Sequence, residues 1–79
     1  MQFTTDGQAF DIDSEDVVQR LRGHEPERLH QYTVTIGGRV WPVKQAFSVA
    51  TGLPHHRFRS NTARRQLTRL GFKINEEIN

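Results

Sequence analysis

The residues best suited to chemistry in this chain are the arginines between positions 57 and 69 and the short polar side chains among them. At 100° per residue on a helix, Ala63, Leu67 and Leu70 share one arc, and polar residues fill the opposite arc. Arginine donates paired hydrogen bonds to guanine, and asparagine does so to adenine. The pattern therefore predicts a helix over residues 60–70 that buries one face and can present the other to nucleic-acid bases.

The polar face of this helix supplies the candidate binding residues. Base readout in a DNA major groove is expected from Asn61, Arg64 and Arg65, and neither arginine is expected to be buried. Ser60 is expected to be the N-cap of the helix. Asn61 and Thr62 follow in the first turn, where free backbone N–H groups favour a phosphate. The remaining candidates for DNA contact on this helix or near it are Lys44, Arg57, Arg59, Thr62, Thr68 and Arg69. The alternative is a helix face that only keeps the protein in solution.

Charge is distributed unevenly along the chain. Residues 1–30 contain seven acids and three bases, a net charge of −4, although the whole chain carries only +2. Residues 31–73 contain eight bases and no acid, a net charge of +8. Since ordinary surfaces mix both signs, the basic segment predicts a polyanionic partner, most often nucleic acid.

Several classes of function are not expected. Cysteine is absent, which removes thiolate zinc sites and cysteine nucleophiles and favours a reducing compartment, the cytoplasm. His55 and His56 are adjacent in sequence and have no neighbouring carboxylate, so no metal site is expected. No Walker loop, HExxH motif or nucleophile elbow occurs, and no apolar run has the length of a membrane span. We therefore expect no enzyme activity, no cofactor and no membrane partner.

Secondary structure is expected in the order β-β-α-β-β-α-α-β. Asp6-Gly7 predicts a two-residue turn that pairs Phe3 with Phe10. A helix follows over residues 13–22, with Asp13 or Ser14 as its N-cap and Gly23 beyond its end.

A second hairpin is predicted over residues 32–41, because alternating apolar residues flank Gly37-Gly38. This register places Val34 opposite Trp41 and Ile36 opposite Arg39. Trp41 is expected in the core, with a base-stacking role left open. The Gly-Gly tip and Arg39 suit either a DNA-contacting wing or a plain surface turn.

The next helix is expected to begin at Pro42 and to end near Thr51, with Gly52 closing it. Its apolar stripe consists of Val43, Ala46, Phe47 and Ala50, which leaves Lys44, Gln45 and Ser48 facing outward. A short final strand containing Phe72 and Ile74 is expected to pack on the second hairpin.

Residues 32–72 resemble the small winged-helix-like DNA-binding domains at the ends of modification-dependent HNH restriction endonucleases and in small actinobacterial proteins. The resemblance lies in the glycine turn before Trp41-Pro42-Val43-Lys44, in the alanine-containing helix that follows, and in Leu67-x-x-Leu70-Gly71-Phe72. It implies that Lys44 and residues 59–65 face DNA, including a modified base. No HNH nuclease domain accompanies this segment, so cleavage is not implied.

We therefore expect a single α+β domain over residues 1–79, winged-helix-like, with two hairpins and three helices. It would combine an acidic hairpin-helix part, residues 1–30, with a basic hairpin-helix-helix part, residues 31–74. The expected function is binding of double-stranded DNA in a bacterial regulatory or modification-sensing role. The alternative is a protein-interaction adaptor or a homodimer whose basic face meets an acidic surface, and RNA is also open.

Overall fold

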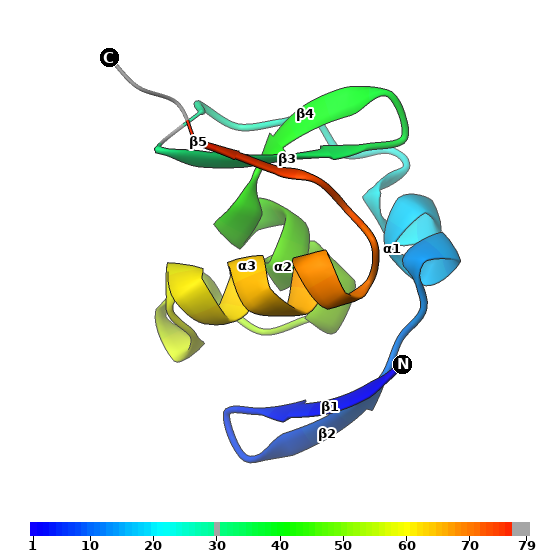
Figure 1. The fold of residues 1–79 in the computed structure, drawn as a ribbon, viewed down its shortest axis with the longest axis vertical. Coiled ribbons are helices and arrows are strands. Elements are labelled where there is room, and N and C mark those ends of the chain that lie inside the picture. Colours follow the sequence, from blue (N-terminus) through cyan, green and yellow to red (C-terminus); the bar gives the residue numbers. More distant parts are fainter. Residues whose placement is uncertain (30, 77–79) are drawn as a thin grey trace.

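Residues 1–29 and 31–76, which this computed structural model describes, form the expected α+β fold (Figure 1). The expectations that involve His30 and residues 77–79 lie outside the described residues. The elements are β1 (Gln2–Thr5), β2 (Gln8–Asp11), α1 (Ser14–Leu21), β3 (Tyr32–Ile36), β4 (Arg39–Pro42), α2 (Val43–Thr51), a 3-10 helix η1 (His55–Arg57), α3 (Ser60–Arg69) and β5 (Ile74–Glu76). Apart from η1, this is the predicted order.

The N-terminal hairpin forms around the predicted turn. Asp6 and Gly7 both have positive φ, 52° and 70°, as a type I′ turn requires. Phe3 pairs with Phe10, and their ring centroids are 5.4 Å apart. The Phe3 ring also lies 5.9 Å from Phe47 of α2, so the hairpin covers the helices at the end opposite the other sheet (Figure 1).

The short helix α1 supports the core from one side. Asp13 precedes it as the N-cap, and its backbone N–H donates to the Asp16 carboxylate at 2.9 Å. Val17 and Leu21 are buried, as their spacing predicts. Arg20 donates a hydrogen bond to the Ala50 carbonyl near the end of α2. The helix is thus held to α2 by apolar packing and by this hydrogen bond.

A three-stranded antiparallel sheet, in the order β4-β3-β5, covers α2 and α3 on the side opposite the N-terminal hairpin. The predicted register is confirmed: Val34 pairs with Trp41, and Ile36 pairs with Arg39. The final strand β5 also forms on the hairpin, and Ile74 pairs with Val34. The Trp41 side chain is 2% exposed, and its Nε1 donates to the Ile36 carbonyl at 3.2 Å. Trp41 is therefore a core residue.

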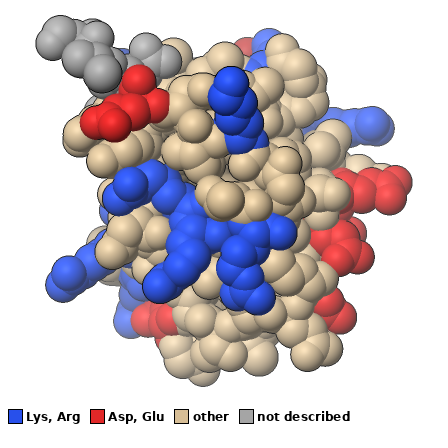
Figure 2. Space-filling model, viewed as in Figure 1, with Lys and Arg blue, Asp and Glu red and all other residues tan. Residues whose placement is uncertain are grey.

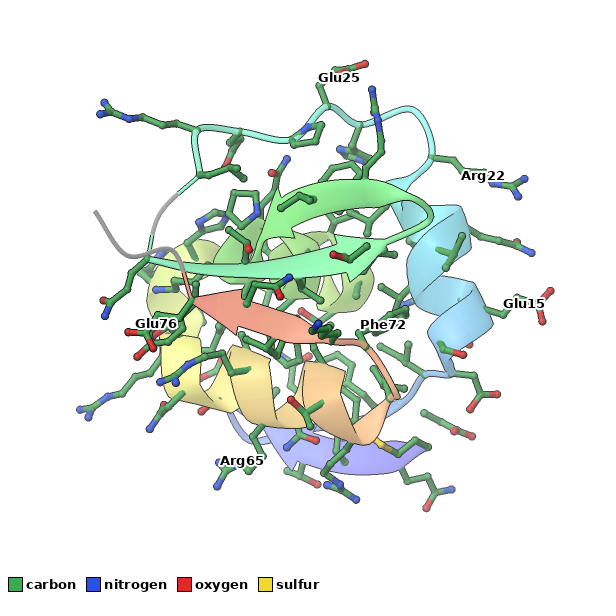
Figure 3. The ribbon with its side chains drawn as sticks, turned by 45° about the horizontal axis from the view of Figure 1, so that its top comes forward. Glu15, Arg22, Glu25, Arg65, Phe72 and Glu76 are labelled. Atoms are coloured by element: carbon green, nitrogen blue, oxygen red, sulfur yellow. The ribbon has the colours of Figure 1, made fainter. Side chains whose placement is uncertain are left out.

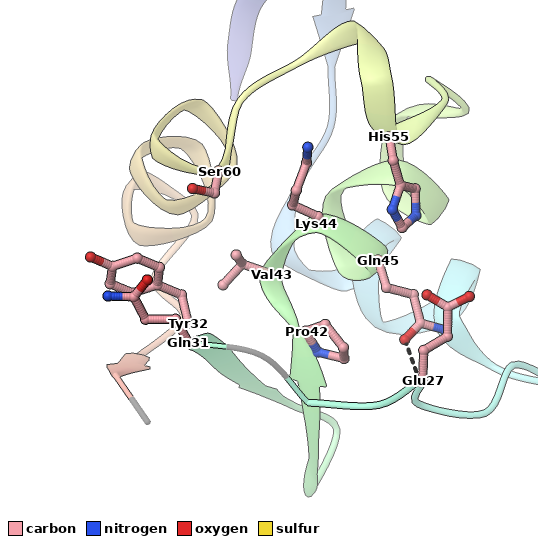
Figure 4. Close-up of a pocket in the computed structure, with 9 residues that line it drawn as sticks. All are labelled: Glu27, Gln31, Tyr32, Pro42, Val43, Lys44, Gln45, His55 and Ser60. Carbon is pink, nitrogen blue, oxygen red and sulfur yellow. Dashed lines mark hydrogen bonds between the residues drawn. The ribbon is translucent and has the colours of Figure 1, made fainter. Parts of the chain in front are cut away.

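Helix α2 buries the predicted apolar stripe and one residue that was predicted wrongly. Gln45 was expected to face outward, but it is only 6% exposed. Its Nε2 donates to the Glu25 carbonyl at 2.8 Å. Its Oε1 accepts from the Glu27 N–H, also at 2.8 Å (Figure 4). A polar side chain can be buried where its donor and acceptor groups are both satisfied. Gln45 thus fastens the segment between α1 and β3, which we call the connector, to α2.

The connection between α2 and α3 is packed rather than loose. Gly52 ends α2 with a φ of 80°, as predicted. Leu53 and Phe58 are buried, and the Phe58 ring lies 4.8 Å from Phe47 in an edge-to-face arrangement. Two core side chains therefore hold the start of α3 against α2.

Helix α3 begins one residue earlier than predicted. Arg59, rather than Ser60, is the N-cap, and its carbonyl accepts the first helical hydrogen bond from Ala63 at 3.2 Å. The Ser60 prediction was wrong because the extended backbone of Arg59 precedes Ser60 directly, which makes Ser60 the first helical residue. Ala63 and Leu67 are buried and Leu70 is half-buried, so the apolar stripe of the helix is confirmed.

We predict that Gln45→Ala lowers the free energy of unfolding by roughly 1–3 kcal/mol, because it leaves the Glu25 carbonyl and the Glu27 N–H of the connector without their partner. Urea unfolding followed by circular dichroism measures this loss. The matched control is Gln19→Ala at an exposed position of α1, which should leave stability nearly unchanged. Equal losses in the two variants would show that the buried amide contributes nothing specific.

Candidate nucleic-acid interface

The exposed face of α3 carries a concentration of positive charge. Figure 2 shows lysine and arginine side chains gathered over α3, with carboxylates along the edge where Figure 1 places α1. Helix α3 contains three arginines and no acidic residue. The acids of α1 and the bases of α3 thus lie on different sides of the folded domain.

The α3 side chains differ in how freely they reach solvent. Arg65 and Arg69 are exposed, as are Asn61 and Thr68, whereas Thr62 is half-buried. Figure 3 shows Arg65 extending outward from α3, and Glu15 of α1 and Arg22, directly after α1, extending on another side. The Arg69 Nη1 donates to the Gln66 side chain at 3.2 Å, on its own helix.

The α3 arginines are not neutralised by acids within the described part of the chain. Across residues 1–29 and 31–76, the ion pairs involve only the N-terminal amine, with Asp11 and Asp13, and Arg39, with Glu25. The basic side chains of α2, η1 and α3 therefore retain their charge for a partner.

Arg64 does not have the exposed environment that the sequence predicted. Its guanidinium carbon lies 3.8 Å from the centroid of the Tyr32 ring, and the side chain is half-buried. Its Nε is buried and has no hydrogen-bond partner among the described residues. The helical angle correctly placed Arg64 on the polar arc, but it gave no information about which strand lies beside that arc.

Three of the predicted phosphate contacts lie around the start of α3 without forming one cluster. Lys44 of α2 is half-buried, with its Nζ 5.4 Å from the centroid of the Phe58 ring. Arg59 is exposed at the N-cap of α3, beside the half-buried Ser60. Arg57 is exposed but lines a separate hollow that also includes Asp6.

Arg39 is not brought together with the α3 arginines. Its Nη2 lies 3.3 Å from the Glu25 carboxylate, and its Nη1 donates to the His24 carbonyl at 3.4 Å. The adjoining Gly37 lies beside Val18 of α1, where a hollow also includes the end of that helix. The hairpin tip, which the sequence suggested as a wing, thus lies on the α1 side of the molecule.

A cavity of about 310 Å³ lies between the first turns of α2 and α3 (Figure 4). Lys44, His55 and Ser60 line it, with the Tyr32 ring on one side and Glu27 at the connector. Neither helix has an acidic residue in its first turn. Sequence reasoning missed this cavity because its walls come from five separate segments of the chain.

The remaining predictions concern metals and membranes. No three histidine or acidic side chains within residues 1–29 and 31–76 lie close enough together to hold a metal ion. None of the described helices combines the length and apolar composition that crossing a bilayer requires.

The fold and the site define a small α+β domain with one basic helix face. Residues 2–79 match the model of the SCO5918-like family, and the chain belongs to this family. No curated protein and no solved structure matches the chain.

The burial of Trp41, the only tryptophan, predicts that it is inaccessible to stacking bases. Acrylamide should quench its fluorescence several-fold less in the folded protein than in the guanidinium-unfolded chain, because the core excludes the quencher. Acrylamide is uncharged, so the basic surface does not bias the comparison. Equal quenching in both states would return Trp41 to the candidates for base stacking.

Proposed function

We propose that this protein binds double-stranded DNA through the exposed face of α3. The proposal rests on the arginines of α3, none of which forms an ion pair with a carboxylate of the described residues. The opposite face of the same helix is buried. Phosphate neutralisation by such side chains supplies much of the affinity of proteins for DNA. An α-helix also has the right width for the major groove.

The position of α3 supports this use. The buried side chains of Phe58 and Leu67 attach the helix to the core. Its exposed side presents Asn61, Arg65 and Thr68. Recognition helices commonly contact base edges with their N-terminal residues. In this arrangement Asn61 faces the bases, whereas Arg59, Arg65 and Arg69 contact phosphates.

The proposed role is that of a regulatory or modification-sensing module without nuclease activity, acting in the cytoplasm. In this proposal α3 serves as the recognition helix of a winged-helix-like domain. The β3–β4 tip is left out of the interface because Arg39 pairs with Glu25 on the α1 side. Lys44 is retained because it lies beside the first turn of α3.

The charge distribution favours a second candidate, an adaptor or homodimer. Acids in the first turn of α1 lie on one side of the domain and the bases of α3 lie on another, so the α1 side of one copy is complementary to the α3 side of a second copy. This association would also weaken with salt. Sedimentation velocity without nucleic acid distinguishes it from DNA binding.

The DNA proposal predicts binding to duplex DNA that weakens steeply between about 50 and 200 mM salt. The variant Arg65→Ala/Arg69→Ala should make the slope of log affinity against log salt shallower by roughly two, because each phosphate contact contributes about −0.9. Fluorescence anisotropy with labelled duplex DNA measures both quantities.

The matched control is Arg22→Ala/Arg28→Ala, which removes the same charge from exposed positions of the acidic part. It should bind DNA nearly as well as the unmodified protein. Equal losses of DNA affinity in the two double variants would indicate that DNA is attracted by the net charge of the protein alone. Absence of binding to duplex DNA at the lowest salt would overturn the proposal, and parallel assays with RNA and single strands would identify another nucleic acid.

A further inference from the structure

We infer that Tyr32 is a positioning residue that holds Arg64 ready to recognise guanine, while the exposed arginines of α3 supply affinity without base preference. The inference rests on the proposed binding of DNA. It assigns a role to Tyr32, which lies on a strand outside the basic helix. It also distinguishes the role of Arg64 in DNA binding from that of Arg65.

The stacking geometry restricts the Arg64 side chain. A distance of 3.8 Å between the guanidinium carbon and the ring centroid is a direct contact over the ring face. Arginine is suited to this arrangement because its guanidinium group is planar and weakly hydrated. The contact thus confines a side chain that would otherwise sample many rotamers.

The three nitrogens of the Arg64 guanidinium group differ in their surroundings. Nε is the guanidinium nitrogen of Arg64 that is both buried and without a partner, so this part of the group faces the protein. The two Nη atoms make no hydrogen bond with another described residue, and neither is among the buried atoms that lack a partner. In the inferred complex, these two atoms are the pair of donors that meets the base.

Tyr32 is itself held by the sheet. It is the first residue of β3, and it pairs with Glu76 of β5. The next residues, Thr33 and Val34, are paired on both sides, with β4 and with β5. The ring therefore stands on the central strand of the sheet, which provides a stable support for Arg64.

Paired donors on a fixed plane match guanine. The O6 and N7 atoms of guanine are two acceptors side by side in the major groove, whereas adenine offers N7 beside an N6 donor. Arg65 is exposed and has no such support, so it suits phosphates or adaptable contacts. A binding site held in advance in the right geometry discriminates more sharply than a mobile one.

The experiment compares two labelled duplexes of identical sequence, one containing guanine and the other 7-deazaguanine, which lacks the N7 acceptor but pairs normally. The unmodified protein should prefer the guanine duplex by roughly tenfold, the effect expected for one good paired contact. Tyr32→Leu and Arg64→Lys should reduce this ratio towards one. Both variants should leave the salt slope nearly unchanged, since the charge of residue 64 is retained.

Two further variants serve as controls. Tyr32→Phe keeps the ring face and should retain the preference, whereas a role of the hydroxyl group would remove it. Arg65→Lys makes the same chemical change as Arg64→Lys one position along the helix, and it should also retain the preference. Thermal unfolding identifies any variant that fails to fold, and Arg64→Lys carries the test if Tyr32→Leu is such a variant.

The outcomes separate the two proposals. A guanine preference that is preserved in either Tyr32→Leu or Arg64→Lys would overturn the inference, as would loss of affinity for both duplexes in equal proportion. A ratio of one in the unmodified protein would overturn it while leaving DNA binding intact. Absence of any DNA binding would instead overturn the proposed function.

Discussion

The packing of the Phe47 side chain determines how the other elements are arranged. This residue of α2 is 1% exposed, and its ring contacts Phe3 of β1 on one side and Phe58 before α3 on the other. Aromatic rings contribute large buried areas and prefer such tilted and edge-to-face contacts. One side chain therefore connects the N-terminal hairpin, the central helix and the start of the basic helix, so the orientation of α3 depends on the core.

Features that depend on neighbouring residues could be predicted from the sequence. Asp6-Gly7 and Gly37-Gly38 define both hairpin registers because a two-residue turn determines which residues face each other. The apolar stripes of α2 and α3 were also predicted, since burial follows the helical period. The α+β class and the element order follow from these local signals, whereas DNA binding, the winged-helix likeness and the role of each basic residue remain proposals.

The final strand was correctly expected on the second hairpin, but most other contacts between distant segments could not be predicted. Gln45 has a polar type and an outward helical angle, yet the connector crosses it and satisfies its amide. Arg64 was predicted on the correct face, but its contact with Tyr32 joins segments far apart in the sequence. Arg39 belongs to the basic segment, but the acidic connector lies against it. Periodicity determines the face of an element and not its neighbour, so the sequence overestimated the number of free basic residues.

The pairing of β5 with β3 has a consequence for how the chain folds. Each hairpin closes over a two-residue turn, a process that takes microseconds, whereas Val34 meets Ile74 only after two helices have been placed between them. Contacts between distant residues slow folding because the intervening chain must first lose entropy. During synthesis, β3 would therefore have an unpaired edge until the last segment emerges. Once β5 is in place it covers this edge of β3, and the charged residues Lys73 and Glu76 then discourage pairing with another chain at the new edge.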